Sequence, residues 1–197
     1  MLAYHDQEWG VPLVEDSALF GNLLLSGAQA GLSWKTVLLR REGYRRAFAG
    51  FDPLAIAAFG EEDEARLLAD PGIIRNRQKV RSALQNARAV VRLRDTAQGS
   101  FAGWLWGFLE GPPVQNAWIE TTQVPARSAL SDRISKAMLA EGFSFAGSTI
   151  VYAWLQSVGL INDHLVSCFR YQPVGLLQQH CPLIPAPADG RPDRPQS

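Results

Sequence analysis

The chain has 197 residues, of which 47% are hydrophobic, and its 19 basic and 19 acidic side chains give a formal net charge of zero. This length suits one well-buried domain or at most two small ones, and no apolar run approaches the ~20 residues that a membrane-spanning helix needs. The first residues lack the pattern of a secretory signal and only Cys168 and Cys181 are present, so we expect no disulfide framework and a cytoplasmic protein without membrane contact.

Helical periodicity runs through almost the whole chain, and no stretch shows sustained strand alternation. Capping residues predict helices that begin near Asp16, at Ser33 and at Asp52. Further apolar stripes predict helices over residues 61–69, 76–94, 100–109, 131–140 and 147–158, and the last of these is apolar on nearly every side, as a central buried helix would be. The chain becomes proline-rich after Tyr171, so we expect an all-α domain over residues 1–171 and a disordered tail over residues 172–197.

The helix expected over residues 76–94 is basic. Its arginines at positions 77, 81, 88 and 92 fall within an arc of ~60° at 100° per residue. Such a row could follow a DNA backbone and release counterions. It could equally be a solvated face whose arginines lie over the edge of the core.

Two turns could contact nucleic acid without charged side chains. Residues 142–149 join two helices, and a tight hairpin there would present backbone N–H groups near Gly147 to a phosphate. Residues 29–34 form a small-residue loop that could present Leu32, with Trp34 offering a flat face for stacking. The alternatives are an ordinary turn in the first case and core residues at a turn in the second.

A metal site is suggested by residues from both ends of the chain. His164 and Cys168 are four residues apart and would point the same way on a short helix. His5 could supply a third ligand across the fold. Zinc usually takes four nitrogen or sulfur ligands, and His180 or Cys181 could supply the fourth although both lie in the proline-rich region.

Four blocks of sequence, in this order and spacing, resemble the DNA-3-methyladenine glycosylase I family. The blocks are Tyr4-His5-Asp6-x-Glu8-Trp9-Gly10-Val11-Pro12, Gln29-Ala30-Gly31-Leu32-Ser33-Trp34, Gly72-Ile73-Ile74-Arg75-x-Arg77-x-Lys79 and Gly159-Leu160-x-Asn162-Asp163-His164. The resemblance runs from about Tyr4 to Cys168. It implies a helix-hairpin-helix DNA glycosylase fold with a structural zinc clasp that joins the termini.

The resemblance also implies an activity and roles for particular residues. Members of this family act in base excision repair: they flip 3-methyladenine out of double-stranded alkylated DNA and hydrolyse its N-glycosidic bond without lyase activity. We expect this protein to act as a monomer. By analogy, Tyr4, Ser26 and Trp34 would line the base pocket, and His5, His164 and Cys168 would bind structural Zn²⁺. The contacts with DNA would come from Gly31, Leu32, Phe145, Gly147 and Ser148, with Leu32 filling the gap in the base stack.

The sequence departs from the family pattern at two places. The family's fourth zinc ligand is a cysteine upstream of the Tyr4-His5-Asp6 block, and this chain begins at Met1, so one ligand is missing from it. The family also carries a glutamate that hydrogen-bonds the methylated base, where this chain has Ser26. A serine is shorter and uncharged. The alternatives to methyladenine excision are therefore an altered base specificity or a non-catalytic module that binds damaged DNA.

Overall fold

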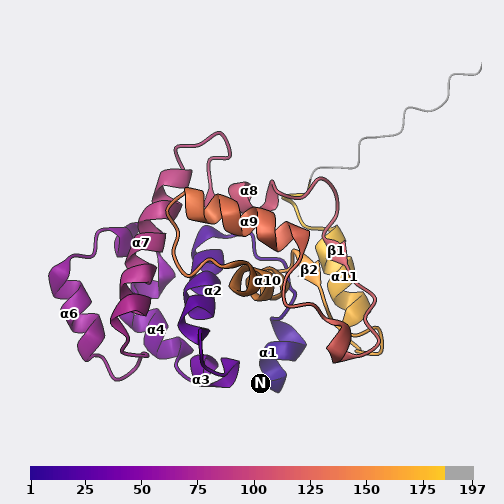
Figure 1. Ribbon diagram of the computed structural model, residues 1–197, viewed down its shortest axis with the longest axis horizontal. Helices are drawn as coiled ribbons and strands as arrows, with labels where there is room; N and C mark the ends of the chain where they lie inside the picture. Colours follow the sequence, from indigo (N-terminus) through magenta and orange to yellow (C-terminus); the bar gives the residue numbers. More distant parts are fainter. Residues whose placement is uncertain (185–197) are drawn as a thin grey trace, which may run out of the picture.

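The computed structural model describes residues 1–184, and residues 185–197 lie outside it. Helices make up the fold, as expected (Figure 1). In chain order the elements are α1 (Leu2–Gln7), α2 (Asp16–Gln29), α3 (Trp34–Leu38), α4 (Arg41–Ala47), the 3₁₀ turn η1 (Ala49–Phe51), α5 (Pro53–Ala57), α6 (Glu61–Ala69), α7 (Arg77–Leu93), α8 (Phe101–Trp106), β1 (Val114–Gln115), the 3₁₀ turn η2 (Thr121–Gln123), α9 (Ala129–Ala140), α10 (Ser148–Ser157), β2 (Ile161–Asn162) and α11 (Tyr171–Gln179).

The helix starts follow the capping chemistry of the sequence. The side chains of Ser33, Asp52 and Asn76 each accept a hydrogen bond from a backbone N–H in the first turn of α3, α5 and α7. Asp16 is an exception, because it lies inside α2 and its carboxylate instead accepts from the Ala102 N–H at the start of α8. That bond fixes α2 against α8.

The core is centred on α10, as its apolar composition predicts. Val151, Trp154 and Leu155 are fully buried in it, and α10 packs on α9 and α2. In Figure 1, α10 lies in the middle of the molecule, with α6 and α7 at one end and α11 at the other. Since α9 and α10 are joined by the hairpin of residues 141–147, this central helix begins at an exposed residue, Gly147.

The sequence did not predict the two strands or the helices α1, α4 and α11. β1 and β2 form a parallel pair with Val114 opposite Ile161, too short for an alternating pattern to show. The prediction of a disordered tail is wrong over residues 172–184, because most of this part of the chain forms helix α11. Val174 and Gln178 are fully buried and anchor α11 on the body of the domain. The remainder of the predicted tail, residues 185–197, lies outside the described residues. Within residues 1–184 none of the helices has the length and apolar character that crossing a bilayer requires.

Candidate functional site

Tyr4, Ser26 and Trp34 line one cavity of about 160 Å³, which we call the small cavity. They come from α1, α2 and α3, and the rings of Tyr4 and Trp34 lie 5.4 Å apart at 56°. The remaining lining residues are Trp9, Gln29, Ala153, Gln156 and Ser157. No charged side chain lines this cavity, so aromatic faces and neutral hydrogen-bonding groups define its chemistry.

The polar groups of the three expected residues have different environments. Ser26 is 7% exposed, and its hydroxyl donates to the carbonyl of Asn22 at 2.9 Å, one turn back along α2. Burial and the nearby Glu8 carboxylate raise the pKa of Tyr4 to about 12, so its phenol is neutral and able to donate. The indole Nε1 of Trp34 is buried without a hydrogen-bond partner in the described part of the chain.

A second, larger cavity of about 240 Å³ shares Tyr4 and Trp34 with the small cavity, and we call it the large cavity. Its rim carries Glu8 and Arg41, whose side chains pair with each other at 2.5 Å. Tyr4 and Trp34 therefore form a wall with a neutral cavity on one side and a charged rim on the other.

The small cavity adjoins a groove between the 29–33 loop and the first turns of α10. A groove of about 210 Å³, here the loop groove, shares Ser26, Gln29 and Ala153 with the small cavity. Its other lining residues are Ala30, Gly31, Leu32, Thr149 and Ile150. The loop expected to contact DNA thus lies beside the small cavity, whereas Phe145, Gly147 and Ser148 do not line this groove.

Backbone geometry at the loop and hairpin is unusual. Gly31 has φ +74° and is exposed, and Leu32 beside it is 40% exposed. Phe145 has φ +52°, a conformation that a non-glycine residue rarely adopts. Gly147 is exposed at the N-cap of α10 with open space around it and no side-chain cap, so the first N–H groups of α10 lack a capping side chain. Ser148 is less free, because its hydroxyl donates to Asp132 at 2.5 Å.

Lys79 fixes the shape of the loop, a role that the sequence did not reveal. Its ammonium group donates to the carbonyls of Ala28 and Ala30, both at 2.8 Å, at the C-terminal end of α2. A cation is favoured there by the helix dipole, and burial lowers the pKa of Lys79.

His5, His164 and Cys168 also converge, and we call them the His–Cys cluster. Their ligand atoms lie within 4.8 Å of one another, with 3.6 Å between Cys168 Sγ and His5 Nε2. The expected helix from His164 to Cys168 is wrong, since a turn brings the two side chains together. His180 and Cys181 are not part of the cluster, and burial raises the pKa of the Cys181 thiol, which disfavours it as a ligand.

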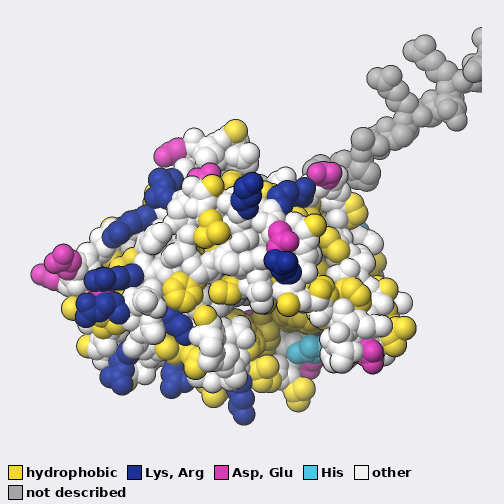
Figure 2. Space-filling model, in the orientation of Figure 1, with side chains coloured by type: hydrophobic (Ala, Val, Ile, Leu, Met, Phe, Trp, Pro, Cys, Tyr) yellow, Lys and Arg dark blue, Asp and Glu magenta, His cyan; other side chains and the backbone are white. Residues whose placement is uncertain are grey.

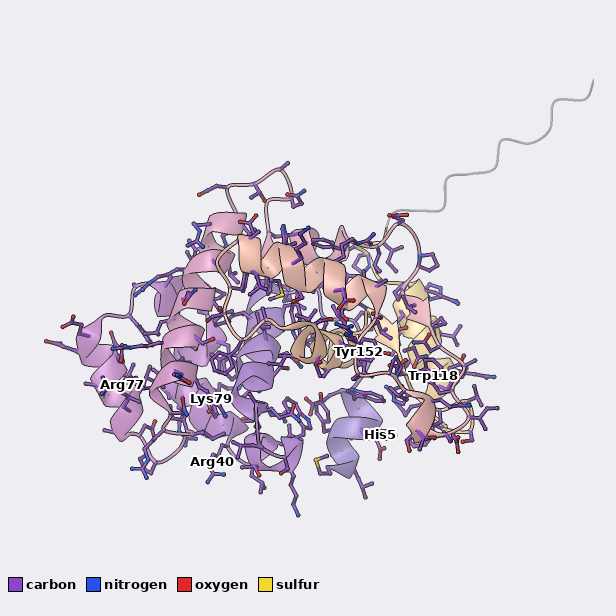
Figure 3. The ribbon with its side chains drawn as sticks, in the orientation of Figure 1. His5, Arg40, Arg77, Lys79, Trp118 and Tyr152 are labelled. Carbon is purple, nitrogen blue, oxygen red and sulfur yellow. The ribbon has the colours of Figure 1, made fainter. Side chains whose placement is uncertain are left out.

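The two histidines of the cluster are oriented by neighbouring oxygens. His5 Nδ1 donates to Asp6 at 2.7 Å, and His164 Nδ1 donates to the Asn162 amide oxygen at 3.0 Å. Both Nε2 atoms therefore keep a lone pair, which is how second-shell groups present metal-binding histidines. His164 Nε2 is buried with no partner in residues 1–184, and burial, together with His5 and Arg170, lowers the pKa of His164 to about 4. Two imidazole nitrogens and a cysteine sulfur are a donor set that suits zinc. His5 is labelled in Figure 3.

Most arginines of the row on α7 form an ion pair or hydrogen bonds within the protein. Arg81 pairs with Glu64 at 2.8 Å, and Arg92 donates to the carbonyl of Glu141. Arg88 donates to the carbonyls of Ala57 and Phe59. These contacts support the alternative of a structural face, although Figure 2 shows basic side chains gathered over the half of the molecule that carries α6 and α7.

The site also contains residues that the sequence did not single out. Trp9 lines the small cavity and packs on His164 with ring centroids 4.4 Å apart, so it links the His–Cys cluster to the cavity wall. Gln156 lines the same cavity and donates to the buried carboxylate of Asp163 at 2.6 Å. The available signal for Gln156 was a long amide side chain in a helix whose other polar residues are small or aromatic.

Comparison with known proteins identifies relatives that span most of the chain. Residues 1–171 match the family model described as methyladenine glycosylase. DNA-3-methyladenine glycosylase 1 of Escherichia coli K12 is 44% identical over 170 residues, which cover 86% of this chain and 90% of that protein. A solved variant of 3-methyladenine DNA glycosylase I, with a tyrosine changed to phenylalanine and 3-methyladenine bound, is 32% identical with a TM-score of 0.83, covering 86% of this chain and 91% of that one. A glutamate-to-glutamine variant from Staphylococcus aureus is 33% identical with the same TM-score and coverage of 86% and 91%.

Proposed function

We propose, on the premise that the chain belongs to the methyladenine glycosylase family, that it removes 3-methyladenine from alkylated double-stranded DNA. The enzyme would hydrolyse the N-glycosidic bond of the flipped nucleotide as a step of base excision repair. The observation that carries this proposal is the small cavity, which lies behind the Tyr4–Trp34 wall and opens on the exposed loop groove.

The chemistry of the lesion matches a cavity without charged groups. Methylation at N3 leaves the base cationic, so the glycosidic bond is already weak and the base departs neutral. Catalysis then needs selective binding of the flipped base, an approach path for water, and interactions that strengthen as the bond breaks. Tyr4 and Trp34 supply stacking surfaces, and Gln156 and the Tyr4 hydroxyl supply hydrogen-bonding groups.

The loop and hairpin would hold the DNA. Leu32, presented by the exposed Gly31 turn, would fill the space that the flipped nucleotide leaves. The N–H groups after Gly147, at the start of the ten-residue helix α10, would bind a phosphate beside it. The turn at Phe145 places that helix end next to the 27–31 segment, because Phe145 Cβ lies 3.7 Å from the position of a Cβ on Gly27.

The same residues support a monofunctional reaction. Lyase activity requires an amine that attacks the sugar, and no lysine lines the small cavity. Lys79 is committed to the carbonyls of Ala28 and Ala30. Cavity and groove are built from one chain, so we expect a monomer to be sufficient.

The His–Cys cluster would hold a structural zinc ion. The unpartnered Nε2 of His164, the lone pair of His5 Nε2 and the thiol of Cys168 supply two nitrogen ligands and one sulfur ligand. Such an ion would connect α1 to the turn after β2 and so fix Tyr4 and Trp9 in the wall of the small cavity. Its role would be to stabilise the fold and not to react.

Ser26 supports a second candidate function. The tyrosine and the glutamate replaced in the two solved variants are separated in numbering by the same interval as Tyr4 and Ser26. Ser26 thus stands where those relatives have the glutamate. A family member with another base specificity, or a module that binds damaged DNA without catalysis, would follow from that change.

Release of free base from methylated duplex DNA tests the proposal. Wild-type protein at high concentration with zinc supplied should liberate 3-methyladenine, detected by chromatography, and leave abasic sites without strand cleavage. No liberated base from wild type, together with strong release by Ser26→Glu, would instead support the non-catalytic candidate. Liberation of a different methylated base would support altered specificity.

A further inference from the structure

Asp163 forms a buried hydrogen-bonding centre behind the small cavity. Its side chain is 4% exposed. One carboxylate oxygen accepts from Asn116 Nδ2 at 2.6 Å and from Trp118 Nε1 at 2.8 Å. The other accepts from the Tyr152 hydroxyl and from Gln156 Nε2, both at 2.6 Å. Trp118 and Tyr152, labelled in Figure 3, come from the segment after β1 and from α10. Throughout residues 1–184 no basic side chain pairs with Asp163.

This centre determines which way the Gln156 amide points. A carboxylate oxygen accepts hydrogen bonds and cannot accept one from an amide oxygen, so Nε2 of Gln156 must face Asp163. Oε1 then points away from Asp163. No hydrogen bond to Oε1 is formed within the described residues, and Oε1 is not among the buried atoms that lack a partner. Because Gln156 lines the small cavity, its free acceptor opens into that cavity.

An acceptor held in this position distinguishes purines by the group at C6. Adenine carries an amino group there, which donates, whereas hypoxanthine and guanine carry an oxo group, which only accepts. A site built to pair with a donor discriminates strongly against a base that lacks one, since the buried acceptor is then left unsatisfied. The glutamate that resemblance would place at position 26 is absent here, so the selection must come from other groups in the cavity.

We propose that Gln156 is a specificity-determining residue that reads the C6 amino group of the flipped base, and that Asp163 is the positioning residue that holds the Gln156 amide oxygen toward the base. This assignment rests on the proposed function of the small cavity. It assigns base selection to Gln156 on α10 and to Asp163 after β2. The sequence alone pointed instead to Ser26 on α2.

Replacement of Asp163 by asparagine should reverse the orientation of Gln156. Trp118 Nε1 can only donate, so the oxygen of the new amide must stay on the Trp118 side and its NH₂ group must face Tyr152 and Gln156. The Tyr152 hydroxyl can rotate to accept. Gln156 can accept only by turning its oxygen inward, which presents Nε2 to the cavity. A donor at that position would favour an oxo group over an amino group.

The test uses the purified full chain and two free bases, 3-methyladenine and 3-methylhypoxanthine, with binding followed by fluorescence of the cavity tryptophans. Wild type should bind the amino base at least about tenfold more tightly. Asp163→Asn should reduce this preference by about tenfold or reverse it. Gln156→Met should abolish the preference, and the exposed Gln179→Met on α11 is the matched control that keeps it.

A double-mutant cycle separates positioning from general structure. If Asp163 acts through Gln156, Asp163→Asn should not alter the base preference in the Gln156→Met background. An unchanged preference in Gln156→Met, or an equal effect of Asp163→Asn in both backgrounds, would overturn the assignment. A wild type that binds neither base would overturn the proposed function itself, which is a different result.

Discussion

The small and large cavities share the Tyr4–Trp34 wall, yet they differ in how their polar groups are used. In the large cavity Glu8 and Arg41 pair with each other, and Arg45 lies over the ring of Phe51 at 5.3 Å. In the small cavity Gln156 carries an acceptor with no partner in the described part of the chain, and the cavity adjoins the exposed loop groove. The unused hydrogen-bonding capacity of Gln156, beside the loop proposed to contact DNA, favours the small cavity as the base site although the large cavity has the greater volume.

The largest expected effect concerns zinc, which in the proposed function binds the His–Cys cluster and fixes Tyr4 and Trp9 in the wall of the small cavity. Zinc at about a thousand times its dissociation constant should raise the free energy of unfolding by about 4 kcal/mol. In Cys168→Ser this gain should largely vanish, and base release should fall with it. Urea unfolding with zinc or with a chelator measures the effect, and the exposed His180→Ala serves as control. Equal gains in Cys168→Ser and wild type would contradict the cluster as the metal site.

Lowering the pH should reduce the free energy of unfolding of the metal-free protein through His164. The pKa of His164 is about 4 in the folded protein against an ordinary 6.5, so the unfolded chain binds more protons between these values and stability falls as pH falls. The loss should begin near pH 6.5 and reach at most about 3 kcal/mol near pH 4. Urea midpoints of chelator-treated protein across this range measure it. His164→Gln should remove this component, and identical slopes in variant and wild type would contradict the assignment.

A matched pair of substitutions distinguishes the two cavities directly. Ser26→Leu should fill the small cavity, and Ala18→Leu should narrow the large one. Stacking on aromatic side chains is worth about 1–3 kcal/mol per base. Exclusion of the base by Ser26→Leu should therefore lower single-turnover base release by about a hundredfold, while Ala18→Leu should leave it nearly unchanged. The opposite ranking would assign the base to the large cavity.

Substitution of Lys79 tests whether the shape of the loop groove affects base release from the small cavity. Lys79→Met leaves the carbonyls of Ala28 and Ala30 without their charged donor, which should cost about 1–2 kcal/mol of stability. Base release should fall further than stability explains, because the 29–33 loop loses its fixed shape. The control is Lys35→Met at an exposed position of α3. Unchanged release by a folded Lys79→Met would separate the loop from the reaction.

The smallest expected effect lies on the rim of the large cavity. Glu8 and Arg41 are both partly exposed, and exposed ion pairs contribute about 0–1 kcal/mol. Arg41→Ala should therefore change stability by less than about 1 kcal/mol and leave base release unchanged. A large loss of release in this variant would indicate that the charged rim takes part.

The sequence predicted the parts of the fold that depend on local chemistry. The capping side chains of Ser33 and Asp52 determine where two helices begin, and the apolar composition of residues 147–158 identifies the central helix. The prediction of a disordered tail was wrong over residues 172–184 because the burial of Val174 and Gln178 depends on partners distant in the sequence. One of these is the carbonyl of Gly10, which accepts a hydrogen bond from Gln178. Proline content reports only the local backbone preference of a segment. It does not show whether the segment can pack against the rest of the domain.

The convergence of the candidate residues was predicted because they lie in or beside the blocks that resemble the family. Tyr4, Ser26 and Trp34 do share a cavity, and His5, His164 and Cys168 do converge, although through a turn where a helix was expected. The Asp163 centre could not be found in the same way. Its donors include Asn116 and Trp118, some 45 or more positions away in the chain and in no block with it.

A crystal structure with 3-methyladenine bound tests the central claim most directly. The base should lie in the small cavity, against the rings of Tyr4 and Trp34, with its C6 amino group within hydrogen-bond distance of Gln156 Oε1. A base bound in the large cavity beside Glu8 and Arg41, or a small cavity that remains empty at saturating concentrations of the base, would contradict the account.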